Sequence, residues 1–135
     1  MKGKNTTKLD NNDLELLVKW CTKKFGYSKY IKGKPTIIFD IDLEKLDYLG
    51  LYDWDKNLIT INPINNIRGI CGIVIHEYSH YLQDGDRYVL LGDGVLYEEN
   101  HFETKADKRM DKYKDRLYLW FKENKGKKVK LKDIK

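Results

Sequence analysis

The chain has 135 residues, a formal net charge of +5 and 41% hydrophobic residues, and its aromatic side chains comprise 10 Tyr, 4 Phe and 3 Trp. This composition excludes a disordered chain, and the length predicts one domain whose core needs no disulfides. The longest apolar run, residues 70–75, is too short to cross a bilayer, and residues 1–13 contain no apolar signal segment. Cys21 and Cys71 lack C-x-x-C spacing, so we expect reduced core thiols and a cytoplasmic protein that does not engage a membrane.

Lysine supplies most of the positive charge, since the chain has 22 lysines and 4 arginines. Seven of the lysines lie within residues 122–135. We expect residues 1–124 to form the single domain and residues 125–135 to form a basic, flexible tail. Lysine does not recognise bases bidentately and the tail has no aromatic residue, so a nucleic acid is not the expected partner.

The first predicted element is a helix near the N-terminus. Polar residues 10–13 can cap a helix, and apolar residues then recur at helical spacing from Leu14 to Phe25. Gly26 follows directly and is a typical residue at a helix end. The sequence therefore predicts an amphipathic helix that packs on the core.

A small mixed sheet is predicted next. Residues 35–39 form a short run of β-branched and aromatic residues, which favours a strand. Residues 49–54 and 58–61 flank the turn-forming residues 55–57, which predicts a hairpin.

The next helix carries the most informative motif of the chain. It is predicted to begin near residues 65–68 and to run to about Gln83, with apolar residues around much of its circumference. Within it, His-Glu-Tyr-Ser-His matches H-E-x-x-H, and helical spacing places His76 and His80 on one face, one turn apart. Gly72 lies one turn before His76, where we expect another backbone to pack closely.

A second long helix is predicted after a connecting loop at residues 88–94. It begins around residues 96–99 and continues to Phe121, with one apolar face. Glu103 and Asp107 are four residues apart in the pattern E-x-x-A-D and share a face beside that apolar stripe. The 22 residues between His80 and Glu103 give a connection long enough for the two helices to pack across each other.

H-E-x-x-H followed by E-x-x-A-D, within residues 76–107, resembles the gluzincin group of zinc metallopeptidases. In size the chain is similar to the minigluzincins, which are little more than the catalytic core. The order of hairpin and helix before the motif also resembles the ImmA/IrrE peptidases, although these usually carry asparagine at the position of Asp107. The resemblance implies an α+β, zincin-like fold.

The resemblance also implies a chemistry. One zinc ion would be bound by His76, His80 and Glu103, and Asp107 would orient the first histidine. Glu77 would be the general base and acid that activates water for hydrolysis of a peptide bond. The substrate would be a peptide or protein, and strand 58–61 would be an edge strand along which an extended substrate can bind.

Several alternatives remain open from the sequence. Other candidates for the third ligand are Glu98, Glu99 and His101, although His101 points to a different side of the helix from Glu103. Candidates for stabilising an oxyanion are Tyr88, Tyr97 and Tyr113, and His101 is either a surface residue or a further such group at the rim of the cleft. The alternative function is a zinc-binding regulatory or interaction protein with no general proteolytic activity.

Overall fold

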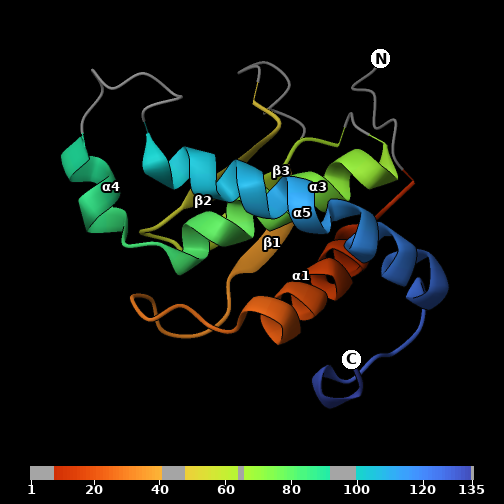
Figure 1. Cartoon of the computed structure of the whole chain (residues 1–135). Helices are drawn as coiled ribbons and strands as arrows, with labels where there is room; N and C mark the ends of the chain where they lie inside the picture. Colours follow the sequence, from red (N-terminus) through yellow and green to blue (C-terminus); the bar gives the residue numbers. More distant parts are fainter. Residues whose placement is uncertain (1–7, 41–47, 64–65, 92–99, 135) are drawn as a thin grey trace.

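A computed structural model describes residues 8–40, 48–63, 66–91 and 100–134 (Figure 1). Its elements in chain order are α1 (Asn11–Phe25), β1 (Thr36–Phe39), β2 (Gly50–Asp53), β3 (Leu58–Ile61), α3 (Ile67–Leu82), α4 (Gly85–Leu91), α5 (His101–Asn124) and the 3₁₀ helix η2 (Leu131–Asp133). The predicted α+β architecture is confirmed, with an N-terminal helix, a small sheet and two long helices. The predicted start of the last helix, at residues 96–99, lies outside the described residues.

Helix α1 begins at a reciprocal cap. The Asp10 carboxylate accepts a hydrogen bond from the Asp13 backbone N–H at 2.9 Å, and the Asp13 carboxylate accepts one from the Asp10 N–H at 3.0 Å. These bonds satisfy donors that the start of a helix leaves free. The helix ends at Gly26, whose φ of 83° lies in the left-handed region that favours glycine. On its core side, Leu14 and Leu17 are fully buried.

The three strands form a mixed sheet in the order β1-β3-β2. In this sheet β3 pairs antiparallel with β2, which confirms the predicted hairpin, and parallel with β1. The prediction that Leu58–Ile61 is an edge strand is therefore wrong, since this strand is central and β2 is at an edge among the strands that the structure describes. Alternating apolar residues occur in both kinds of strand, so the sequence pattern did not distinguish them.

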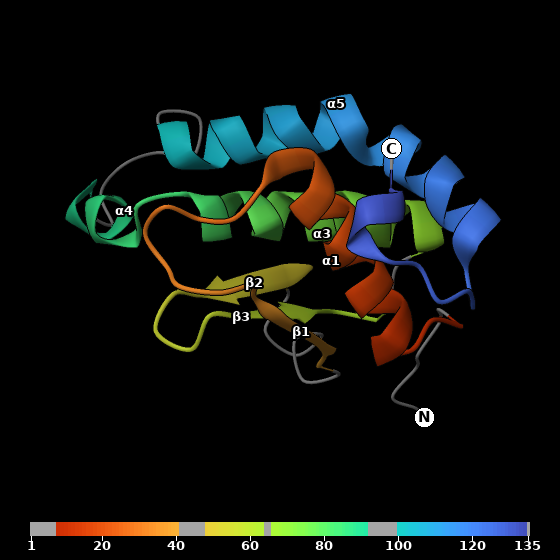
Figure 2. The same ribbon diagram turned by 90° about the horizontal axis from the view of Figure 1, so that it is seen from below.

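Helix α3 lies between the sheet and α5, and it also contacts α1 (Figure 2). This position explains why apolar residues surround most of the helix, including the fully buried Ile70, Val74 and Ile75. At Gly72, a Cβ atom would lie 3.2 Å from the Met110 side chain of α5. The close neighbour there is thus a side chain and not the backbone that the sequence analysis predicts.

A short helix replaces part of the loop predicted at residues 88–94. The Asp84 carboxylate accepts hydrogen bonds from the N–H groups of Asp86 at 3.1 Å and Arg87 at 3.4 Å, and so caps α4. The Asp84 carbonyl then accepts from the Tyr88 N–H at 3.0 Å. Residues 88–91 therefore belong to α4, and residues 92–94 lie outside the described part of the chain.

The C-terminal segment lies against α1. Ile134 is 3% exposed and belongs to the core, and the Lys19 ammonium donates to the Val129 carbonyl at 2.9 Å. In this segment, which the sequence predicts to be a flexible tail, Ile134 is buried and the partly buried Val129 and Leu131 pack against the core. Lys127 and Lys128 stay exposed.

Both cysteines are buried free thiols, as predicted. Burial raises the pKa of the Cys71 thiol to about 12, and it raises the pKa of Cys21 as well, so both stay protonated and unreactive at neutral pH. Within the described ranges, no helix is long and apolar enough to cross a membrane.

Candidate metal centre

Two histidines project from one face of α3. His76 and His80 lie one helical turn apart, with ring centroids 5.0 Å from each other. Their side chains are 14% and 6% exposed, respectively. The start of α3 is fixed by Asn66, whose side chain accepts from the Gly69 N–H at 2.7 Å.

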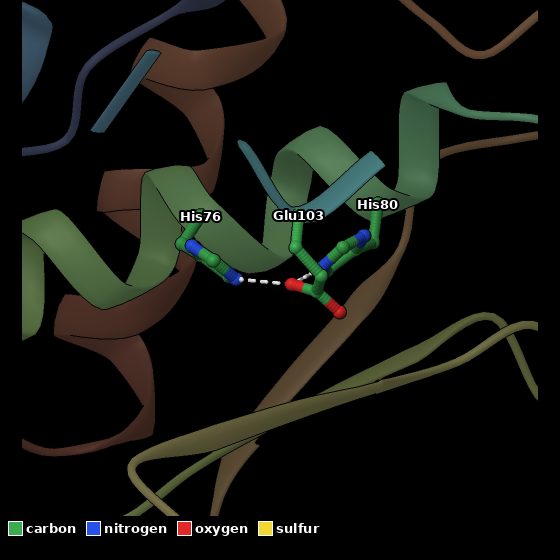
Figure 3. A group of neighbouring side chains, drawn as sticks. All are labelled: His76, His80 and Glu103. Atoms are coloured by element: carbon green, nitrogen blue, oxygen red, sulfur yellow. Dashed lines mark hydrogen bonds and ion pairs between the residues drawn. The ribbon is translucent and has the colours of Figure 1, made fainter. Parts of the chain in front are cut away.

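Glu103 reaches these histidines from the first turn of α5 (Figure 3). Its Oε1 atom is 3.1 Å from His76 Nε2 and 3.0 Å from His80 Nε2. One ligand atom from each of the three residues lies within 4.8 Å of the other two. Asn100 caps α5 by accepting from the N–H groups of Phe102 and Glu103, which holds the first turn in place. The structure thus brings together the three residues that the sequence predicts as ligands.

The second nitrogen of each histidine is also held by an oxygen atom. His76 Nδ1 is 2.9 Å from Asp107 Oδ1, and His80 Nδ1 is 2.8 Å from Gln83 Oε1. The Gln83 amide is oriented in turn, because its Nε2 donates to the Phe102 carbonyl at 2.8 Å. Such contacts fix the tautomer and the orientation of a metal-binding imidazole.

These contacts explain why the site favours a positively charged ligand. Because the Nδ1 atoms face oxygen acceptors, each neutral ring carries its proton on Nδ1 and a lone pair on Nε2. Both lone pairs then point at Oε1 of Glu103, which is itself an acceptor. A cation between them resolves this conflict, because two imidazole nitrogens and one carboxylate oxygen are a common ligand set of zinc. The donor set therefore fits a metal ion.

A proton on a histidine Nε2 would resolve the same conflict, and the local pKa shifts reflect this alternative. Burial opposes protonation of His76, but its hydrogen bond with Glu103 and the nearby carboxylates outweigh burial and raise its pKa. Burial also opposes the charge on Glu103, yet its hydrogen bonds with the two histidines and Tyr88 hold the pKa of this carboxyl well below its usual range. The three side chains are thus electrostatically coupled.

The Glu77 side chain extends from α3 towards the edge strand β2. A Cβ atom at Gly50 would lie 3.2 Å from Glu77 Cγ, 3.3 Å from Glu77 Oε2 and 2.7 Å from Ile73 Cγ2. Gly50 therefore provides the space that the Glu77 carboxylate occupies. Burial raises the pKa of Glu77, which is 7% exposed. A raised pKa brings a carboxylate closer to the range in which it can both take up and release a proton.

Aromatic rings form one wall of the site. The Trp54 ring lies 5.7 Å from the His80 ring and 5.0 Å from the Tyr88 ring, measured between centroids. The Tyr88 hydroxyl donates a hydrogen bond to Oε2 of Glu103. These apolar surfaces reduce the access of solvent to His80 and Glu103, which strengthens electrostatic interactions there.

The other candidates from the sequence do not join this group, as far as they are described. His101 is exposed, and its ring lies 4.1 Å from that of Phe102. Tyr113 packs against Phe25 at 5.1 Å and lies ten residues along α5 from Glu103, a distance of about 15 Å. Three candidates lie outside the described residues: Tyr97, Glu98 and Glu99.

Gln83 is the contact that sequence reasoning missed. It stands three residues after the second histidine, at the end of α3, so a side chain able to reach His80 was visible in the sequence. Its second contact, to the Phe102 carbonyl, depends on how α5 packs on α3 and has no sequence signal.

We expect Gln83→Met to weaken metal binding by roughly 10- to 100-fold, the usual effect of removing a partner of a ligand histidine. Methionine has a similar volume but neither accepts from His80 Nδ1 nor donates to the Phe102 carbonyl. Competition with a chelator of known affinity would measure the change. Gln83→Glu is the matched variant, because its carboxylate still accepts from His80 and we expect a smaller loss. Equal affinity in Gln83→Met and the parent would contradict a positioning role.

Comparison of the chain with protein-family models, with curated proteins and with solved structures gave no match. The functional argument therefore rests on the geometry of the site. That geometry defines a candidate metal centre built from two histidines and one glutamate on two helices.

Proposed function

We propose that this protein is a zinc-dependent metallopeptidase of the gluzincin type. The observation that carries the proposal is the convergence of His76, His80 and Glu103 on one point, with the Glu77 carboxylate on the same helix as both histidines. A metal site with three protein ligands leaves positions free for other ligands, which is typical of catalytic zinc and not of structural zinc.

His76, His80 and Glu103 would hold the ion, and the ligand types favour zinc. When bound there, zinc supplies Lewis acidity, which lowers the pKa of water towards about 7 and polarises a carbonyl group. The Asp107 and Gln83 contacts hold the Nδ1 atoms, and so would leave both imidazole Nε2 atoms available to bind the ion.

Glu77 would carry out the proton transfers. Its carboxylate takes a proton from the attacking water and later delivers that proton to the amine that leaves. Burial of Glu77 supports this role, because it raises the pKa of the carboxyl and so makes the carboxylate a better base for a proton of water.

Strand β2 would align the substrate. It lies at the edge of the sheet, and its residue Gly50 borders the Glu77 carboxylate. An extended peptide can add to a sheet edge through backbone hydrogen bonds, which would place its carbonyl groups beside Glu77. Strand β2, and not the central strand Leu58–Ile61, would therefore align the substrate.

The experiment that tests the proposal combines metal content with hydrolysis. We expect native mass spectrometry to show one zinc ion per chain, and we expect cleavage of casein or a peptide library that stops on addition of chelator and returns with zinc. A parent protein that binds no zinc after reconstitution would contradict the proposal. Zinc binding without cleavage of any substrate would instead identify a zinc-binding protein with no general proteolytic activity.

A further inference from the structure

The two carboxylate oxygens of Glu103 have different partners. Oε1 lies 3.1 Å from His76 Nε2 and 3.0 Å from His80 Nε2, so this oxygen faces the proposed metal site. Oε2 accepts a hydrogen bond from the Tyr88 hydroxyl. One carboxylate oxygen of Glu103 therefore faces the site, and the other is engaged in the hydrogen bond with Tyr88.

This difference affects how many positions around a metal ion the protein fills. A carboxylate can bind an ion through one oxygen or through both. Binding through both would fill a position that a peptidase needs for water and the substrate carbonyl. A hydroxyl that donates to Oε2 competes with binding through that oxygen.

Tyr88 is well placed to keep this contact. It lies on α4, whose start is capped by Asp84. Its ring lies 5.0 Å from that of Trp54 and 5.5 Å from that of Phe102, measured between centroids. Packing on two sides restricts the ring, so the hydroxyl keeps its direction towards Glu103.

We propose that Tyr88 is a positioning residue, which limits Glu103 to one ligand oxygen and thereby keeps coordination positions free for water and substrate. The proposal rests on the proposed zinc site. It also assigns Tyr88 a role different from that of an oxyanion donor, because the single hydroxyl proton is directed at Glu103 and not at the substrate.

The test is Tyr88→Phe, which removes the hydroxyl and retains the ring that packs against Trp54. Tyr113→Phe is the matched control, because it makes the same chemical change on a ring that packs against Phe25. Zinc affinity is measured by chelator competition, and coordination by the visible absorption of the cobalt(II)-substituted protein. Tetrahedral cobalt(II) absorbs more strongly than cobalt(II) with five or six ligands.

We expect Tyr88→Phe to change zinc affinity by roughly 10-fold or more and to lower the cobalt absorption, while Tyr113→Phe matches the parent in both. If both measurements equal those of the parent, the positioning role is overturned. A lower kcat with unchanged affinity and absorption would identify an oxyanion donor and would also overturn it. The metal measurements do not require turnover, so a parent that binds zinc but cleaves nothing contradicts only the proposed function. A parent that binds neither ion contradicts both.

Discussion

The Glu77→Gln variant is expected to bind zinc as the parent does and to hydrolyse peptides roughly 10²- to 10⁴-fold more slowly, the usual contribution of a general acid–base group. Glutamine has nearly the same shape as glutamate, so it fits the space beside Gly50 without displacing β2. It has no carboxylate that can accept and return a proton. The substitution leaves the three proposed ligand residues in place, because Glu77 is not one of them.

The measurement is the steady-state rate with one peptide substrate, together with zinc content, for the parent and the variant. Glu123→Gln provides the control, since it makes the same change at an exposed position of α5 far along the helix from Glu103. Hydrolysis by Glu77→Gln at the parental rate would disprove the proposed chemistry. Loss of zinc from this variant would show that Glu77 contributes to the metal site itself.

The residues of the candidate metal site were largely predictable from sequence because helices fix their relative positions. The spacing of His76 and His80 determines their common face once the segment is helical. Glu103 and Asp107 share a face for the same reason, and Asp107 Oδ1 does lie 2.9 Å from His76 Nδ1. Only the packing of α5 on α3 had to be inferred, and the resemblance to gluzincins supplied that inference.

Features that depend on contacts between distant segments were less predictable. The position of β3 in the sheet depends on β1 pairing with its far side, and the alternation of apolar residues is the same for either arrangement. Helix α4 is only seven residues long, too short for periodicity to distinguish it from an apolar loop. The contact of Tyr88 with Glu103 depends on that helix, so the sequence named Tyr88 as a candidate without indicating what it touches.

The Glu103→Ala variant is expected to lose zinc during dialysis, because it removes the only negatively charged ligand of the proposed set. The two histidines would remain oriented by Asp107 and Gln83, but two neutral imidazoles bind a divalent ion less well than two imidazoles and a carboxylate. Binding to the folded state stabilises a protein by about 4 kcal/mol when the ligand is at 1,000 times Kd. Zinc should therefore raise the Tm of the parent and leave the Tm of Glu103→Ala unchanged.

Thermal unfolding with and without zinc, combined with metal analysis, measures this effect. Glu123→Ala is the matched control on the same helix, and we expect its Tm to respond to zinc as that of the parent does. A metal-free circular dichroism spectrum equal to that of the parent would show that Glu103→Ala is folded, as expected for a side chain outside the apolar core cluster. If folded Glu103→Ala retained one zinc ion per chain, Glu103 would not be the third ligand. The ion would then be held by His76 and His80 with a different partner, and the proposed relation between Glu103 and Tyr88 would also be wrong.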